Sequence, residues 1–335
     1  MAYATTLAAQ PFPDIYPAKQ TLRLTAKRTA AEGIVAFEFS SLDGAPLPPF
    51  GAGDHIMIDL GPQMSRAYSL CNDPAETHRY VIAVLKEPDG KGGSVAMHAL
   101  DEGAEVAVSL PRNNFALVLG AKRHILLAGG IGITPLLSMA HALSRHKADF
   151  VLHYGVRDLS RMALRDLIQA GPFADQCMLH VDGHADYPAY DIPQILAEPN
   201  PDTHVYVCGP TPFIDHVATV AKANGWDPDQ IHWEYFVAPE TDDPAEKVSF
   251  EIELVPGGEI VTVGPEESVV EALEREGIFV LTSCAEGVCG TCLLELVEGE
   301  PDHRDHYLSD ADKARGDCFM GCVSRAAGGR LRIKL

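Results

Sequence analysis

The sequence predicts a multidomain protein of the β and α/β classes: an antiparallel β-barrel or sandwich, a doubly wound parallel α/β domain and a C-terminal β-grasp domain. Three observations predict these parts. Short strand-like runs fill residues 21–115, strands and helices alternate over residues 122–237, and two hairpins surround one helix after residue 247. A length of 335 residues accommodates two or three domains. We expect the barrel at 1–118, the α/β domain at 119–238, a linker at 239–247 and the β-grasp domain at 248–335.

The elements of the first two regions follow from runs of apolar residues that are bounded by Gly, Pro and Asp. In the first region, strands are predicted at residues 55–60, 66–70, 80–86 and 105–110, with a short helix at 94–100. In the second region, strands are predicted at 124–128, 150–156, 177–181, 204–208 and 231–235, and helices at 135–145, 162–169 and 212–224. Regular alternation of strand and helix is typical of a parallel sheet with helices on both faces.

The third region begins after an acidic, Pro-containing stretch, which is typical of a linker. Ser268 and Glu271 form a capping box for a helix that ends at Gly277. Strands are predicted at 248–254, 260–263, 291–298 and 330–335, and a short helix near 309–315. Residues 302–306 carry Asp and His, side chains that can bind metals, but we interpret them as a solvated turn before the helix N-capped by Ser309.

The charge balance excludes two classes of partner. Lys and Arg number 26 and Asp and Glu 47, a formal net charge of −21, whereas nucleic acids and anionic membranes attract basic surfaces. Residues 1–14 contain no Lys or Arg and no sustained apolar run, so no secretory signal is expected. The apolar stretch 125–143 is interrupted by glycines and Pro135, unlike a membrane span. We therefore expect a soluble, cytoplasmic protein, a monomer in isolation, that binds neither nucleic acid nor membrane.

Five of the eight cysteines lie in the last 52 residues. Cys284, Cys289 and Cys292 have the spacing C-x4-C-x2-C, which is that of a plant-type [2Fe–2S] site completed by a distant fourth cysteine. Cys318 and Cys322 are the candidates for that fourth position. Structural zinc is an alternative, although zinc ribbons use paired C-x2-C units and only one such spacing occurs here. Free core thiols are a further alternative.

Two glycine-containing turns follow predicted strands. The segment from Gly129 to Pro135 opens a helix, which places backbone N–H groups where a pyrophosphate can bind. Because the G-x-G-x-x-G pattern is absent, a tight turn without a ligand is the alternative. A second turn, at residues 208–210, ends another strand, and two such turns at the carboxyl edge of one sheet define a binding crevice. For Cys208 the alternative is a buried apolar thiol.

Taken together, these motifs resemble the ferredoxin–NADP⁺ reductase-like flavoproteins. Residues 66–70 match the flavin motif R-x-Y-S, residues 129–135 match G-G-x-G-x-T-P, and residues 208–210 match C-G-P. With the ferredoxin-like segment at the C-terminus, the chain is similar over residues 21–335 to the group of phthalate dioxygenase reductase and vanillate demethylase reductase. The resemblance implies a flavin-binding barrel, a nucleotide-binding α/β domain and a [2Fe–2S] ferredoxin domain.

The resemblance also implies roles for individual residues. Cys322 follows Cys292 after 29 intervening residues, as in such ferredoxins, and the implied metal ligands are Cys284, Cys289, Cys292 and Cys322. The implied flavin site comprises Arg66, Ala67, Tyr68, Ser69, Leu85, Lys86, Gly92, Gly93, Ser94 and Phe236. The implied nucleotide site comprises Gly130, Thr134, Pro135, Asp158, Cys208, Gly209 and Pro210. The implied catalytic residues, close to the reacting atoms, are Ser69, Cys208 and Glu234.

The cofactor identities implied by the resemblance are FMN rather than FAD, a [2Fe–2S] cluster, and NADH. Gly92, Gly93 and Ser94 suit a terminal phosphate at a helix start. Asp158 favours the ribose 2′-hydroxyl of NADH, whereas Ser160 with Arg161 suits the 2′-phosphate of NADPH.

The implied function is an NADH-dependent reductase that passes electrons through flavin and a [2Fe–2S] cluster to a partner. By the same resemblance, that partner is a Rieske-type non-haem iron aromatic oxygenase, either hydroxylating or O-demethylating. Two alternatives stay open: a reductase for another oxygenase or acceptor, and a redox-sensing module without turnover.

Overall fold

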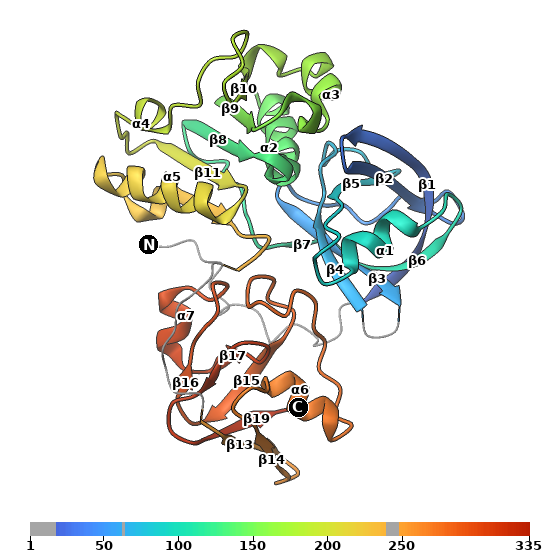
Figure 1. Ribbon diagram of the computed structural model, residues 1–335, viewed down its shortest axis with the longest axis vertical. Coiled ribbons are helices and arrows are strands. Elements are labelled where there is room, and N and C mark those ends of the chain that lie inside the picture. Colours follow the sequence, from blue (N-terminus) through green and yellow to red (C-terminus); the bar gives the residue numbers. More distant parts are fainter. Residues whose placement is uncertain (1–17, 62–63, 239–247) are drawn as a thin grey trace. The chain divides into compact units, whose positions relative to one another are not determined.

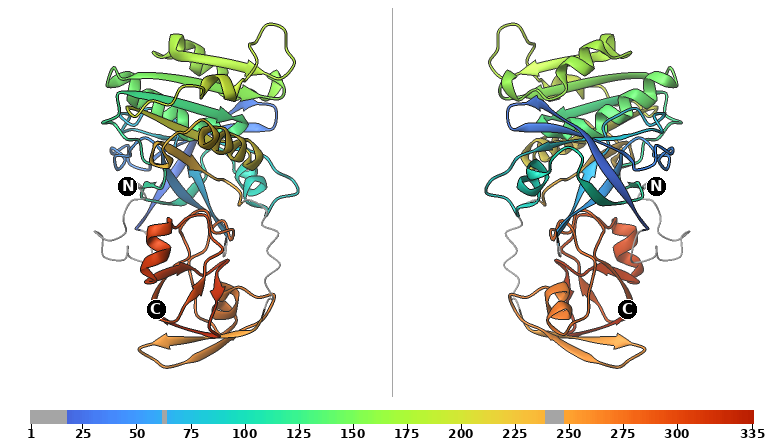
Figure 2. Two further views of the ribbon diagram at one scale, coloured as in Figure 1. Left: turned by 90° about the vertical axis from the view of Figure 1, so that its left-hand side faces the viewer. Right: turned by 90° about the vertical axis from the view of Figure 1, so that its right-hand side faces the viewer.

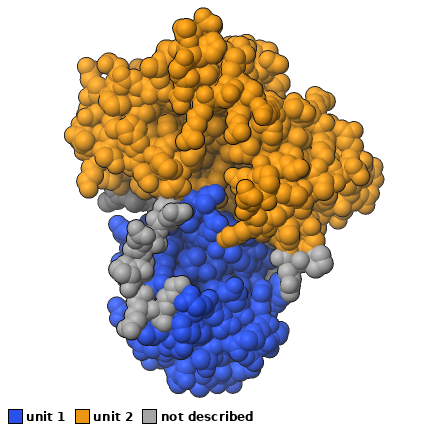
Figure 3. Space-filling model, in the orientation of Figure 1, with its two compact units in different colours: residues 1–17, 237–335 blue, residues 18–236 orange. Residues whose placement is uncertain are grey.

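The structure is a computed structural model that describes residues 18–61, 64–238 and 248–335. These residues fall into two compact units, 18–236 and 237–335, which Figure 3 colours orange and blue. The larger unit contains both the antiparallel and the parallel sheet, and the smaller unit contains the C-terminal mixed sheet. The predicted fold class is confirmed. The predicted boundary between residues 118 and 119 stays a prediction, and the predicted linker at 239–247 lies outside the described residues.

The N-terminal sheet is antiparallel, in the order β4–β3–β6–β1–β2–β5, with β7 paired to β3. Its elements are β1 (Lys19–Ala31), β2 (Ile34–Ser41), β3 (Asp54–Gly61), β4 (Met64–Ser69), β5 (Tyr80–Leu85), α1 (Gly93–Ala99), β6 (Glu105–Ser109) and β7 (Arg112–Asn113). The sheet curls so that its end strands β4 and β5 contact each other. Leu22 and Leu24 of β1 point into the core, while the residues that alternate with them face solvent. The sequence predicted β-structure here without placing β1 and β2 individually.

The second sheet is parallel, in the order β10–β9–β8–β11–β12, and the order reverses between β8 and β11. Its elements are β8 (Arg123–Gly129), α2 (Ile133–Arg145), β9 (Asp149–Val156), α3 (Arg165–Ala170), β10 (Cys177–Val181), α4 (Ile192–Ile195), β11 (Thr203–Cys208), α5 (Thr211–Ala223) and β12 (Ile231–Glu234). Apolar residues of α2 and α3 pack into the core on one face, and those of α4 and α5 pack into the core on the other (Figure 1). The helix predicted from residue 162 begins later because Leu164 has a positive φ of 58°.

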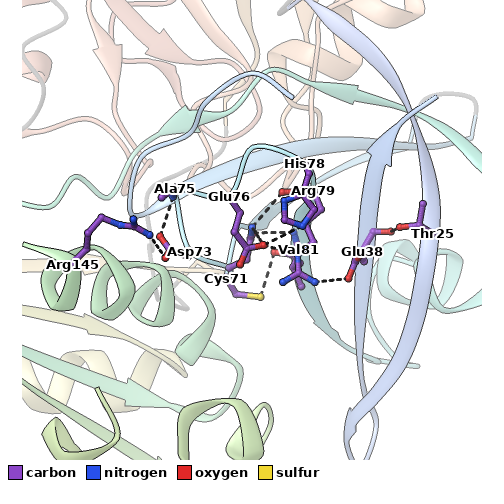
Figure 4. A network of polar contacts seen from close by, with 11 residues as sticks. Thr25, Glu38, Cys71, Asp73, Ala75, Glu76, His78, Arg79, Val81 and Arg145 are labelled. Carbon is purple, nitrogen blue, oxygen red and sulfur yellow. Dashed lines mark hydrogen bonds and ion pairs between the residues drawn. The ribbon is translucent and has the colours of Figure 1, made fainter. Parts of the chain in front are cut away.

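A shared core and a polar network fasten the barrel to the parallel sheet. Phe115, from the barrel region, belongs to the same buried cluster as the apolar face of α2. In the polar network of Figure 4, Arg145 at the end of α2 pairs with Asp73 of the loop before β5. To its right in the same figure, Arg79 pairs with Glu38 of β2 at 2.8 Å. Side chains from both sheets therefore belong to one compact unit.

The C-terminal unit has a mixed sheet in the order β14–β13–β19–β15–β17, in which β13 and β19 are parallel. Its elements are β13 (Phe250–Val255), β14 (Ile260–Val263), α6 (Val269–Arg275), β15 (Leu293–Glu298), β16 (Pro301–Asp302), α7 (Asp310–Arg315), β17 (Cys318–Met320), β18 (Arg325–Ala326) and β19 (Arg330–Lys334). Figure 2 shows the orange hairpin β13–β14 from two sides. The predicted capping box of Ser268 and Glu271 is confirmed. Arg325 is buried and donates to three backbone carbonyls, which joins the start of β13 to the loop before α6.

The segment before α7 corrects one interpretation. Residues 302–306 were expected to be a solvated turn, but the side chain of Asp305 is 0% exposed and that of His303 only 13%. The carboxylate of Asp305 accepts hydrogen bonds from the backbone N–H groups of Tyr307 and Leu308, at 3.2 and 2.8 Å. These bonds hold the side chain in a buried position within the turn. Polar composition predicted exposure, whereas local backbone donors decided burial.

Among the helices of the described ranges, none combines the length and the apolar character that a bilayer span requires.

Candidate functional site

The two glycine turns that the sequence singled out meet at the carboxyl ends of β8 and β11. Strand register places Cys208 beside Ala128 on one side and beside Glu234 on the other. A Cβ built on Gly132 would lie 2.2 Å from the carbonyl oxygen of Cys208, so only glycine allows the two turns to approach so closely. The turns therefore form one surface at the point where the strand order reverses, which is where open α/β sheets bind ligands.

Ser69, Glu234 and Cys208 come together although they lie on separate strands. The hydroxyl of Ser69, at the end of β4, donates to Oε2 of Glu234 at 3.4 Å. Burial raises the pKa of Glu234 to about 8, against the opposing effect of the Ser69 hydrogen bond. Burial and the neighbouring Glu234 raise the pKa of the Cys208 thiol well above its usual value. Near neutral pH this site consequently holds a protonated carboxyl between a hydroxyl and a thiol.

Arg66 lies against the start of α1. Its guanidinium donates to the carbonyls of Ser65 and Lys91, at 2.9 and 3.0 Å, and a Cβ on Gly93 would lie 2.5 Å from Cγ of Arg66. Gly92 has a φ of 82°, a conformation that glycine adopts without strain. A guanidinium beside the first turn of a helix, whose backbone N–H groups have no partner within the helix, is a suitable environment for a phosphate.

The other residues implied for the flavin occupy the same end of the barrel. Ala67 and Tyr68 lie on β4, opposite Met57 and Ile56 of β3. Leu85 ends β5, and the backbone N–H of Lys86 donates to the carbonyl of Gly33 at 2.8 Å.

Further along the chain, the hydroxyl of Ser94 accepts from the backbone N–H of Glu87 at 3.0 Å and so organises the loop before α1. Phe236, just after β12, is 37% exposed.

The nucleotide-turn residues surround the start of α2. Gly130 has a φ of 55°, and the hydroxyl of Thr134 donates to the carbonyl of Ile131 at 3.1 Å. Pro135 is buried in the first turn of α2. A Cβ on Gly209 would lie 3.0 Å from Cα of Gly129, and Pro210 precedes the first turn of α5.

Asp158 follows β9 and is joined there by a carboxylate that the sequence did not single out. Asp158 accepts from the N–H of Ser160 at 2.8 Å, and this bond lowers the pKa of its carboxyl. The hydroxyl of Ser160 donates to Glu32 of the β1–β2 turn at 2.7 Å. Two carboxylates thus surround Ser160. No sequence signal pointed to Glu32, because it lies in a different sheet.

The four predicted cysteine ligands assemble as two pairs. Side-chain hydrogen bonding links Cys284 with Cys289 and Cys292 with Cys322 and shifts the pKa values of the first three of these thiols, and the Cys289 thiol also donates to the hydroxyl oxygen of Thr291 at 3.2 Å. The bond with Cys289, together with backbone N–H groups, lowers the pKa of the Cys284 thiol to about 6 despite burial. Hydrogen bonding with their partners raises the pKa of the Cys289 and Cys292 thiols. Cys318 instead lies on β17, opposite Glu295 of β15.

The donor set fits a centre with two metal ions. Over the described ranges, no three or more His, Cys, Asp or Glu side chains converge on a single metal-ion position. Two pairs of thiols match a [2Fe–2S] cluster, in which each iron takes two cysteines. Gly287 and Gly290 have φ values of 70° and 75°. Glycine adopts this conformation without strain, and because it has no side chain, neighbouring residues can pack close to the backbone of the loop.

Comparisons with known proteins cover both units. The profile of the oxidoreductase NAD-binding domain matches residues 126–219, and that of the 2Fe-2S iron-sulfur cluster binding domain matches residues 252–327. Vanillate O-demethylase oxidoreductase of Pseudomonas sp. (strain HR199 / DSM 7063) is 42% identical over 313 residues, 93% of this chain and 98% of that protein.

Two solved structures are similar over almost the whole chain. Phthalate dioxygenase reductase, described as a modular structure for electron transfer from pyridine nucleotides to [2Fe–2S], has a TM-score of 0.72 and 38% identity, covering 95% of this chain and 98% of that one. An intact type IV self-sufficient cytochrome P450 monooxygenase has a TM-score of 0.84 and 32% identity, covering 99% of this chain and 44% of that longer chain.

Proposed function

The chain belongs to the family of oxygenase reductases that includes vanillate O-demethylase oxidoreductase and phthalate dioxygenase reductase, and from this premise we propose that its partner is a Rieske-type non-haem iron oxygenase acting on an aromatic substrate. It is an NADH-dependent oxidoreductase with a flavin and a [2Fe–2S] cluster. The observation that supports the assignment most strongly is the C-x4-C-x2-C spacing of Cys284, Cys289 and Cys292 within residues 252–327, which match the 2Fe-2S iron-sulfur cluster binding domain, in a chain that also carries the glycine turns.

A flavin bound here would supply the chemistry of accepting a hydride from the nicotinamide and of passing single electrons to the cluster. The protein holds the reactants in place. In our proposal Ser69, Glu234 and Cys208 line the position where flavin and nicotinamide meet. Glu234 keeps a proton on its carboxyl near neutral pH because burial raises its pKa to about 8, so it donates a hydrogen bond without adding negative charge.

The flavin in our proposal is FMN, with its phosphate held by Arg66 and the backbone of Gly92, Gly93 and Ser94. The close packing of Arg66 on Gly93 supports this assignment. The remaining proposed flavin contacts are Ala67, Tyr68, Leu85, Lys86 and Phe236. FAD is the alternative, and acid extraction followed by mass determination of the released flavin distinguishes the two.

The dinucleotide in our proposal binds along Gly130, Thr134, Pro135, Cys208, Gly209 and Pro210. Its ribose lies beside Asp158. The presence of a second carboxylate, Glu32, bonded to Ser160 supports the preference for NADH, because a 2′-phosphate would meet two negative charges there.

The proposed partner rests on the names of the relatives, since vanillate and phthalate are aromatic acids. A cytochrome P450 is the second candidate, because the P450 monooxygenase contains a region similar to 99% of this chain. We further propose that the protein is a monomer and works in the cytoplasm. All eight cysteines are free thiols in the structure, which supports a reducing compartment.

An anaerobic titration with NADH tests the electron path. The expected result is bleaching of the flavin and iron–sulfur absorbance and the EPR signal of a reduced [2Fe–2S] centre. Cys292→Ser should abolish the cluster signal and cytochrome c reduction while leaving flavin reduction intact, and Cys318→Ser, the matched control, should change neither. Loss of the cluster in Cys318→Ser but not in Cys322→Ser would overturn the ligand assignment.

The partner is tested by reconstitution. The protein is mixed with NADH and either the oxygenase component of a vanillate O-demethylase or an isolated P450 haem domain. Faster turnover with the first supports an aromatic oxygenase as partner. Faster turnover with the second overturns that part of the proposal and favours the P450.

A further inference from the structure

The buried segment before α7 has no role in the function proposed above. Asp305 and His303 are enclosed in the C-terminal unit, and their neighbours contact the cysteine loop, residues 284–292. The backbone N–H of His306 donates to the carbonyl of Gly287 at 3.0 Å. A Cβ on Gly287 would lie 3.1 Å from Cβ of Asp305. Cα and Cβ of Asp305 are therefore packed directly on the loop that carries three of the four thiols.

The same segment makes a second contact on the other side of Cys289. A Cβ on Gly290 would lie 2.3 Å from the ring of Tyr307 and 2.8 Å from its hydroxyl oxygen. Both glycines of the cysteine loop are thus covered by residues 305–307. The ammonium of Lys313 donates to the carbonyl of Asp305 at 2.7 Å, which ties the segment to α7.

His303 and Asp305 form a buried pair in which some polar atoms have no hydrogen-bond partner. Nδ1 of His303 lies 3.5 Å from Oδ1 of Asp305. Among the described residues, both ring nitrogens of His303 and Oδ1 of Asp305 are buried without a hydrogen-bond partner. Each such atom costs free energy of folding. Three of them at one place indicate a function other than stability, because natural proteins concentrate such costs at functional sites.

We propose that His303 and Asp305 are a positioning pair that holds the cysteine loop on the [2Fe–2S] cluster and, through the carboxylate, lowers the reduction potential of the cluster. The inference rests on the presence of the cluster in the proposed function. Oδ2 of Asp305 accepts two backbone N–H bonds, which fix the orientation of the side chain in the turn that packs on the loop. A fixed negative charge beside the cluster opposes the addition of an electron, and net charge is a main determinant of cluster potentials.

The test is a mediated redox titration of the full-length protein with cofactors bound, followed by EPR. In Asp305→Asn the side-chain oxygen still accepts the two N–H bonds, but the charge is lost. The reduction equilibrium should shift by about tenfold toward the reduced cluster, which for a one-electron couple is about 59 mV. Asp310→Asn, which removes an exposed charge from the same unit, is the matched control and should shift it by less than twofold. A shift of less than threefold in Asp305→Asn, or one toward the oxidised form, overturns the proposal.

Two variants of His303 test the positioning role. Asn presents an N–H donor close to the place of Nδ1, whereas Leu fills the space without one. His303→Leu should lose iron on gel filtration and show a broadened EPR spectrum, and His303→Asn should keep both iron and spectrum. Equal behaviour of the two variants overturns the pairing.

These measurements can refute the inference about the pair without refuting the proposed function. The titration uses chemical mediators and needs neither NADH nor an oxygenase. A purified, unsubstituted protein without iron would refute the cluster itself, whereas an intact cluster with an unmoved potential in Asp305→Asn would refute only the inference about the pair.

Discussion

Replacing Glu234 by Gln tests how burial controls the charge between the two sheets of the larger unit. Burial raises the pKa of Glu234 to about 8, whereas the ordinary value is 4.5. Between these values the folded protein keeps a proton that the unfolded chain releases. The free energy of unfolding therefore falls as pH rises. The stabilisation is fully present below pH 4.5 and is lost above pH 8. Gln carries no charge at any pH and removes this dependence.

The effect of Glu234 on the free energy of unfolding is clearest between pH 6.5 and 8. Burial lowers the pKa of three histidines, His55, His153 and His232, from 6.5 to about 4. As pH rises from 4 to 6.5, these histidines therefore increase the free energy of unfolding. In that range their effect hides the opposite effect of Glu234. The interval from pH 6.5 to pH 8 is 1.5 pH units. At 1.36 kcal/mol per unit, Glu234 lowers the free energy of unfolding by about 2 kcal/mol over this interval. For a unit of this size the corresponding change in Tm is about 4–8 °C.

The assay is thermal unfolding at pH 6.5 and 8 with saturating flavin, followed by flavin fluorescence. The Tm of the unsubstituted protein should fall between the two pH values by about 4–8 °C more than that of Glu234→Gln. Glu198→Gln, at an exposed site on the same unit, is the control and should follow the unsubstituted protein. Parallel pH dependence of Glu234→Gln and the unsubstituted protein would refute the reasoning.

Other outcomes follow from close contacts. Gly132→Ala brings a Cβ to 2.2 Å from the backbone oxygen of Cys208, so the Kd for NADH should rise at least about tenfold; an unchanged Kd in a fluorescence titration contradicts this. Glu32→Gln removes one of the two carboxylates near Ser160, and the ratio of kcat/KM for NADPH to that for NADH should rise about fivefold; an unchanged ratio excludes a role for Glu32. Arg325→Ala removes a buried guanidinium and leaves three backbone carbonyls without their donor, and it should destabilise the C-terminal unit by about 3 kcal/mol. Urea unfolding followed at the cluster absorbance measures this, and an unmoved midpoint would argue against it.

Local pattern alone was enough to predict the order of the three sheets and most of the elements, although it did not place β1 and β2. Alternation of apolar and polar residues along the chain reports which strand face is buried, and the capping box of Ser268 and Glu271 marks a helix start within four residues. The cysteine spacing belongs to the same class of information. It identified the type of metal centre before any fold was known, because one short loop supplies three thiols.

The site, by contrast, depends on contacts that no local pattern contains. Ser69 and Glu234 are separated by 165 positions, and Glu32 and Ser160 by 128. These pairs form only because the barrel packs against the parallel sheet. Burial of a polar group also depends on what packs over it: Asp305 looked like a surface residue in the sequence and is enclosed by its own turn and the cysteine loop. Chain spacing predicted which chemical groups are present, whereas packing decided which of them meet, lose contact with water and change their pKa values.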